Sequence, residues 1–126
     1  MDFSKIKKAD KLSAELIVKS PATGKLTDVR ITLVSAESAQ YLDALRTIQK
    51  QRQAKRDLNP DLPQDAVDGE AVELLALCTL GWTGVKEGKT EVPFSVEAAK
   101  KLYTEHLWLQ KQVDRFIADG REFFQD

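Results

Sequence analysis

The side chains of this sequence that could act as nucleophiles, acids or metal ligands have surroundings that argue against a reactive role. The single cysteine, Cys78, ends an apolar run over residues 74–78. A reactive thiol needs electropositive, partly exposed surroundings, so we interpret Cys78 as a small buried apolar residue. Glu73 directly precedes that run, and we place it on the solvent-facing side of a helix rather than in an acid–base pair. The single histidine, His106, argues against a metal cluster built on histidines and against a Ser-His-Asp triad.

The motifs of common catalytic and metal sites do not match either. Residues 81–84 (Gly-Trp-Thr-Gly) are too short for a phosphate-binding loop and lack the Lys-Ser/Thr pair that follows one. Neither G-x-S-x-G nor H-E-x-x-H occurs. Asp61, Asp65, Asp68 and Glu70 are close together, but their spacing is not that of an EF-hand loop. We therefore expect a protein that is not an enzyme and that has no cofactor and no metal site.

The charge balance narrows the class of partner. The 126 residues carry 19 basic and 20 acidic side chains, a formal net charge of −1, whereas nucleic-acid binders concentrate positive charge. The residues that begin the sequence lack the apolar stretch of a secretory signal. No segment approaches the ~20 apolar residues that span a bilayer. We expect a cytoplasmic protein that does not bind a membrane.

The first element that must position any site is a β-hairpin over residues 13–34. Val29, Ile31 and Leu33 alternate with polar residues, which is typical of a strand with one wet face, and Gly24 suits the turn. An isolated hairpin is marginally stable in water, so its apolar face must rest on helices.

Three segments are predicted to be helical. Residues 35–57 form a long helix capped by Ser35, whose second half projects into solvent, and residues 69–81 form a central buried helix because they are apolar almost all round. Residues 95–125 form one or more C-terminal helices, with Ser95 as N-cap. An irregular arm (1–12) and two loops (58–68 and 82–94) complete a single domain over residues 1–126. The expected fold class is α+β, mostly helical, with the N-terminal hairpin packed on a bundle of three to four helices.

A family resemblance gives these elements a context. Residues 76–85 (Ala-Leu-Cys-Thr-Leu-Gly-Trp-Thr-Gly-Val), residues 92–99 (Val-Pro-Phe-Ser-Val-Glu-Ala-Ala), Gln112-Val113 and the late Phe-Phe resemble the tail assembly chaperones of long-tailed bacteriophages. The strand–turn–strand–helix opening is similar to that of several small tail proteins. The resemblance implies a non-catalytic factor in the cytoplasm of the bacterial host. Such a factor binds the tape measure protein and helps to recruit tail tube subunits, and it could form a homo-oligomer.

Aromatic and arginine side chains supply much of the binding energy at protein interfaces. The C-terminal helix must bury one face but need not bury all of its aromatic residues. The candidate protein-binding residues are Trp108, Arg115, Phe116, Arg121, Phe123, Phe124 and Trp82. For Trp82 a core position at the end of the helix over 69–81 is the favoured interpretation.

Two other classes remain as alternatives. One is a structural virion component, such as a minor tail or head-tail joining protein. The less favoured one is a nucleic-acid-binding regulator that uses the basic residues Lys50, Arg52, Lys55 and Arg56. We interpret those cations as a solvated helix end, because they suit the C-terminal helix dipole and no aromatic residue among them could stack on a base.

Overall fold

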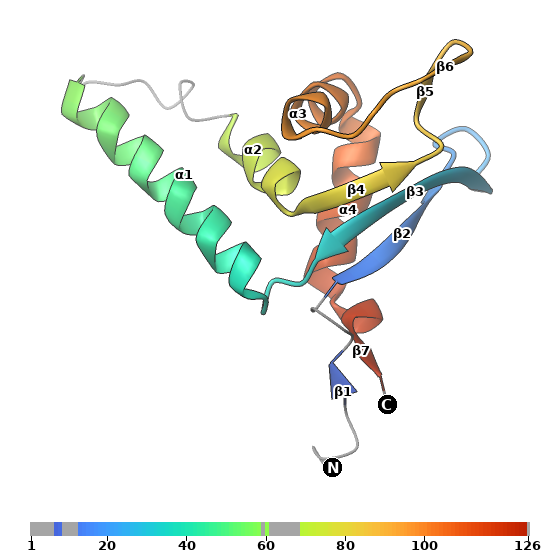
Figure 1. Ribbon diagram of the computed structural model, residues 1–126, viewed down its shortest axis with the longest axis horizontal. Helices are drawn as coiled ribbons and strands as arrows, with labels where there is room; N and C mark the ends of the chain where they lie inside the picture. The colour runs from blue at the N-terminus through green and yellow to red at the C-terminus, as the bar shows by residue number, and fades with distance from the viewer. Residues whose placement is uncertain (1–6, 9–12, 59, 61–68, 126) are drawn as a thin grey trace.

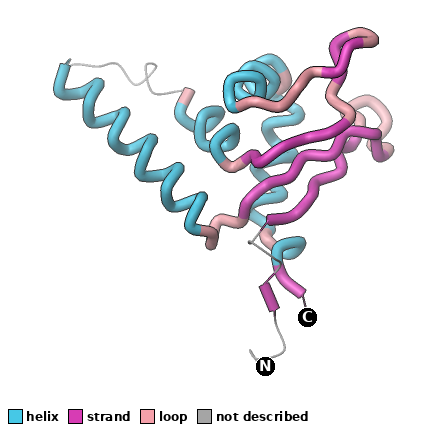
Figure 2. The backbone as a smooth tube through the Cα atoms, in the orientation of Figure 1, coloured by secondary structure: helices cyan, strands magenta, loops and turns pink. Residues whose placement is uncertain are grey.

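The architecture is a small antiparallel sheet with helices on one of its faces. The computed structural model describes residues 7–8, 13–58, 60 and 69–125. The sheet has the strand order β2-β3-β4, from β2 (Ser13–Lys19), β3 (Leu26–Val34) and β4 (Thr79–Thr83). Helices α2 (Glu70–Leu77), α3 (Val96–Glu105) and α4 (Leu107–Asp119) share one buried core with its apolar face (Figures 1 and 2). The predicted α+β class, with an N-terminal hairpin packed on helices, is confirmed.

The hairpin forms as the alternating pattern predicts. Leu16 pairs with Ile31 and Ala14 with Leu33, so these side chains share the face that the helices cover. Ile31 and Leu33 are both fully buried. On the other face, Arg30 forms an ion pair with Glu15 at 3.1 Å in solvent. Alternate residues of these two strands therefore face the helices and the solvent.

The prediction of a helix over residues 69–81 is wrong for its last four residues. Helix α2 ends at Leu77, and β4 begins at Thr79. β4 pairs with β3 through Trp82, opposite Ile31, and through Gly81, opposite Thr32. An apolar run that is buried on several sides has no periodicity that separates a helix from a strand, and pairing with β3 decides the matter here. The prediction of a loop over residues 82–94 is also corrected, because β4 extends to Thr83.

Two further features replace that loop. Strands β5 (Lys86–Glu87) and β6 (Thr90–Glu91) form a short hairpin that stands out from the body of the protein (Figure 1). Gly84, just before it, has φ of +79°, and a Cβ there would collide with the carbonyl oxygen of Asp28. Only glycine fits where the chain leaves the sheet.

The buried hydroxyl of Thr79 connects the turn between α2 and β4 to α3. It donates to the carbonyl oxygen of Leu75 at 2.8 Å and lies 2.8 Å from the Tyr103 hydroxyl. Because a threonine hydroxyl has one hydrogen, which Leu75 accepts, Tyr103 must be the donor to Thr79. Both side chains are buried, Tyr103 completely.

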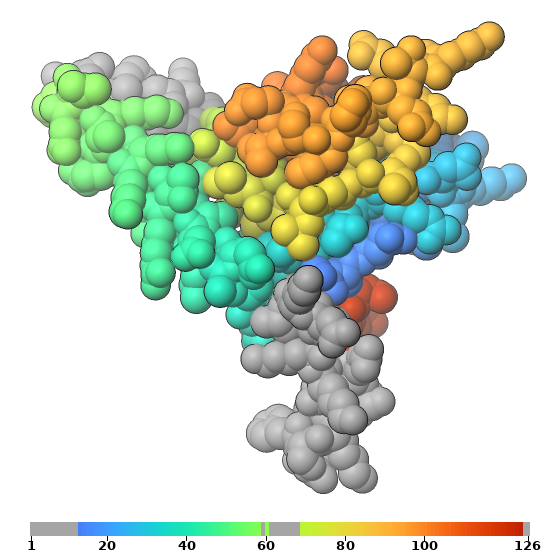
Figure 3. All heavy atoms as spheres, viewed as in Figure 1, coloured from blue at the N-terminus to red at the C-terminus, as the bar shows by residue number. Residues whose placement is uncertain are grey.

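The long helix begins later than predicted. Helix α1 (Ala39–Leu58) is capped by Ser38, whose hydroxyl accepts from the backbone N–H of Tyr41 at 3.0 Å. Ser35 instead accepts from the N–H of Glu37 in the preceding turn, so the prediction of Ser35 as the cap is wrong. The predicted exposure of the second half is confirmed: residues 49–58 are all exposed, and this end of α1 lies at the outer edge of the molecule (Figure 3).

The C-terminal segment divides into two helices at His106, as the prediction of one or more helices allowed. Ser95 caps α3 by accepting from the N–H of Ala98 at 3.0 Å, as predicted. Gly120 ends α4 in the left-handed conformation, and a 3₁₀ turn (Arg121–Phe123) leads into β7 (Phe124–Gln125).

The two ends of the chain meet in a second small sheet. Strand β1 (Lys7–Lys8), within the predicted arm, pairs with β7, so residues near both termini lie side by side (Figure 1). The rest of the arm, and residues 59 and 61–68 of the predicted loop at 58–68, lie outside the described residues.

Replacing Tyr103 with phenylalanine should destabilise the protein without changing its shape. The variant leaves a buried lone pair of Thr79 without its donor, at a cost of about 1–2 kcal/mol in unfolding free energy. Urea denaturation of Tyr103→Phe, Thr79→Val and the double variant measures the coupling between the two residues. Additive effects would contradict this hydrogen bond.

The fold should also lose stability at alkaline pH. Burial raises the pKa of the Cys78 thiol from 9.0 to about 11. Burial likewise raises the pKa of Tyr103 from 10.0 to about 12. Below pH 9 both groups are protonated in the folded and unfolded chains, and between pH 9 and 12 the unfolded chain releases their protons first. The unfolding free energy should therefore fall through this range, by roughly 2–3 kcal/mol from Tyr103.

Tyr103→Phe is the matched control, because it removes one of the two buried acids. Its unfolding free energy, measured by urea denaturation at a series of pH values, should fall less steeply above pH 10 than that of the wild-type protein. Parallel curves for the two proteins would show that Tyr103 does not contribute.

Candidate protein-binding surface

A groove of about 510 Å³ lies between α4 and the edge strand β2. It brings together three of the predicted contact residues, Trp108, Arg115 and Phe116, all from α4. The other lining residues are Leu16, Ile17, Lys19, Lys111, Gln112 and Asp119.

Helical geometry explains why α4 can both complete the core and line this groove. Its buried side chains are Leu109, Val113 and Ile117, a stripe with spacings of four residues. The groove residues 108, 111, 112, 115, 116 and 119 follow the same helical period on a neighbouring stripe. The hypothesis that the last helix leaves some of its aromatic residues for a partner thus has a definite location.

Gln112 holds the two walls of the groove in place. Its side-chain oxygen accepts from the backbone N–H of Lys19 at 3.0 Å, and its side-chain nitrogen donates to the carbonyl oxygen of the same residue at 2.8 Å. The amide therefore imitates a neighbouring strand at the end of β2. This contact joins residues 93 positions apart in the sequence.

The floor and one end of the groove are aromatic. Phe116 is half-buried and packs edge-on against the ring of Phe123, with 5.4 Å between ring centroids. Trp108 is 37% exposed, and its ring lies 5.9 Å from that of His106. Leu107, the first residue of α4, is also exposed.

Three cationic side chains and one carboxylate surround this floor. Lys19, Lys111 and Arg115 are exposed and form no ion pair recorded among the described residues. The Asp119 carboxylate accepts from Arg121 at 2.8 and 3.1 Å. That contact lowers the pKa of Asp119 and keeps it ionised, with its charge already balanced. The groove therefore presents net positive charge around an apolar floor.

The remaining candidate residues lie elsewhere. Phe123 is completely buried, so the expectation that it contacts a partner is corrected: it belongs to the core that supports Phe116. Phe124 is half-buried and packs against the same core. Arg121 is exposed and is held by Asp119 at the edge of the groove.

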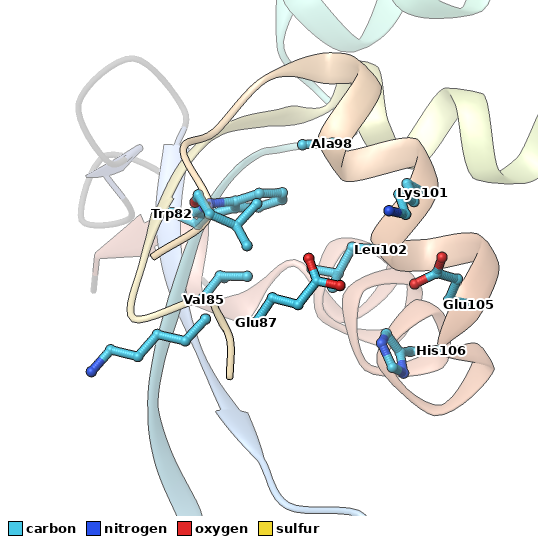
Figure 4. Close-up of a pocket in the computed structure, with 10 residues that line it drawn as sticks. Trp82, Val85, Glu87, Ala98, Lys101, Leu102, Glu105 and His106 are labelled. Atoms are coloured by element: carbon cyan, nitrogen blue, oxygen red, sulfur yellow. The ribbon is translucent and has the colours of Figure 1, made fainter. Parts of the chain in front are cut away.

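Trp82 occupies a different pocket, of about 150 Å³, between β4, the β5–β6 hairpin and α3. Its indole N–H donates to the carbonyl oxygen of Val92 at 2.8 Å, and its ring packs edge-on against Phe94, with 5.1 Å between centroids. Figure 4 shows Trp82 on the strand side of this pocket, with Lys101 and Glu105 on the facing helix. Trp82 packs against the core but lies in β4, not at the end of a helix.

The side chains with catalytic potential lie apart from the groove. Cys78 is buried and its thiol stays protonated at neutral pH because burial raises its pKa. Glu73 is partly exposed and lies 3.5 Å from the ammonium group of Lys100. Of the basic residues on α1, Arg52 forms an ion pair with Glu70, which ties α1 to α2. Among the described residues no three His, Cys, Asp or Glu side chains are grouped to hold a metal ion.

No helix in the described part of the chain is both long enough and apolar enough to cross a membrane.

The sequence could not indicate the wall of the groove that β2 forms. Lys111, Gln112 and Asp119 could have been found by following the helical period from Trp108. Nothing in the pattern of residues 16–19 shows which helix lies against that strand.

Comparison with known proteins places the chain in a phage context. No curated protein and no solved structure matches it. The family model described as YdaY prophage protein matches residues 36–124, which is more than two thirds of the chain and includes α1 to α4 and β4. The chain therefore belongs to the YdaY prophage protein family.

Proposed function

We propose that this protein is a non-catalytic tail assembly chaperone that binds the tape measure protein of its phage and helps to recruit tail tube subunits. Membership of a prophage family supports the phage context. The resemblance of residues 76–85 and 92–99 to tail assembly chaperones supports the specific role. The work would take place in the cytoplasm of the bacterial host.

The observation that carries the proposal is the groove between α4 and β2. An exposed tryptophan, a half-buried phenylalanine and an arginine lie together on one surface, with Phe123 supporting the floor from within. This is the composition of a protein-binding centre, in which aromatic and arginine anchors carry most of the energy. Binding here requires no reactive group, and the buried thiol of Cys78 is not available as one.

Co-expression with the tape measure protein of the same prophage tests the proposal. A stable complex on size-exclusion chromatography is the expected result, together with the absence of this protein from mature particles. Retention in mature particles would favour a structural virion component instead. Failure to form any complex would overturn the chaperone role.

Trp108→Ala should weaken the complex with the tape measure protein at least tenfold. Truncation of an aromatic residue that anchors an interface costs about 2 kcal/mol of binding free energy. Isothermal titration calorimetry with a purified tape measure fragment measures the change. The variant should remain folded, because Trp108 does not belong to the buried core cluster.

Leu80→Ala is the matched control. Leu80 is also a large exposed apolar residue, but it lies on β4, at the opposite edge of the sheet from β2. Its substitution should change the affinity less than twofold. Equal losses from the two variants would show that the groove is not the contact surface.

A further inference from the structure

We propose that the groove between α4 and β2 binds an amphipathic helix whose apolar face is flanked by carboxylates. The inference rests on the proposed function in taking that helix to be a segment of the tape measure protein. It goes further in specifying the secondary structure and the charge that the groove selects.

The dimensions of the groove suit a short helix. Its α4 wall runs from Trp108 to Asp119, which at 1.5 Å per residue is about 16 Å, or three helical turns. Leu16, Trp108 and Phe116 line the groove and would receive one stripe of side chains at positions i, i+3/i+4 and i+7. A helix lying along α4 would therefore meet Trp108 near one end of this wall and Phe116 nearer the other.

The alternative of an added β-strand is disfavoured at the same place. A peptide strand that extended the sheet would need the free backbone groups of β2, the edge strand. At Lys19, both the N–H and the carbonyl oxygen are already taken by Gln112. Recognition in this part of the groove must therefore come from side-chain contacts, which a helix provides.

The charges around the groove favour a partner of negative charge. Lys19, Lys111 and Arg115 contribute three positive charges, whereas the single carboxylate, Asp119, is already neutralised by Arg121. Carboxylates beside the partner's apolar stripe would be attracted, and the guanidinium of Arg115 could receive one of them through two parallel hydrogen bonds. A lysine-flanked helix would meet like charge on the same rim.

Synthetic peptides test this directly. The probe is a fluorescein-labelled 15-residue helix with a leucine stripe flanked by glutamates, compared with the same peptide carrying lysines at those positions. In fluorescence anisotropy titrations we expect the glutamate peptide to bind at least tenfold more tightly. Its affinity should fall as NaCl is raised, because exposed charges are screened. A proline in the middle of the glutamate peptide should abolish binding.

Charge reversal in the groove should exchange the preference. The double variant Lys111→Glu/Arg115→Glu should weaken binding of the glutamate peptide at least tenfold and strengthen binding of the lysine peptide. Lys50→Glu/Lys55→Glu changes the net charge by the same amount on the exposed arm of α1, so it should leave both affinities within twofold. Equal binding of the two peptides, undiminished binding of the proline peptide, or equal effects of the two double variants would each overturn the inference.

The outcome separates this inference from the proposed function. If the tape measure protein binds through Trp108 but the groove shows no preference for glutamate, only the present inference fails. If the glutamate peptide binds in the groove but no complex forms with the tape measure protein, the chaperone role fails and the specificity of the groove stands.

Discussion

The apolar face of β3 must be covered, and the positions of the other elements follow from this. β3 is the one strand of the three-stranded sheet with neighbours on both sides, and its Ile31 and Leu33 are fully buried. A three-stranded sheet with a bare apolar face would not be stable in water. Helices α2, α3 and α4 supply the cover, and their buried side chains form one cluster with the strand. The opposite face carries the Arg30–Glu15 ion pair in solvent.

Local sequence patterns were sufficient to predict the hairpin and the start of α3. The alternation of Val29, Ile31 and Leu33 and the capping chemistry of Ser95 were enough for the hairpin and the start of α3. The change from helix to strand at Cys78 is not visible in that way, because most residues on both sides of it are apolar. What fixes the change is distant: β4 pairs with β3, and the Thr79 hydroxyl is held by Leu75 and Tyr103.

The candidate site was predictable only in part, for the same reason. Composition and helical spacing singled out Trp108, Arg115 and Phe116, which α4 does bring together. The same reasoning could not separate Phe123 from its neighbours, because adjacent phenylalanines are equally apolar and the turn after Gly120 decides which one enters the core. The wall formed by β2 depends on a contact across 93 residues, which has no local signature.

Because Gln112 and Lys19 join distant parts of the chain, the groove forms only in the folded protein. One wall is an early strand and the other is the last helix, so the surface does not exist until α4 has docked. A ligand that touches both walls binds the native chain and not the unfolded one. It must therefore stabilise the whole protein, by about 2.7 kcal/mol when its concentration is one hundred times Kd. Capture of a partner in this groove would therefore be thermodynamically linked to folding, and the partner would in turn support the fold of the protein that binds it.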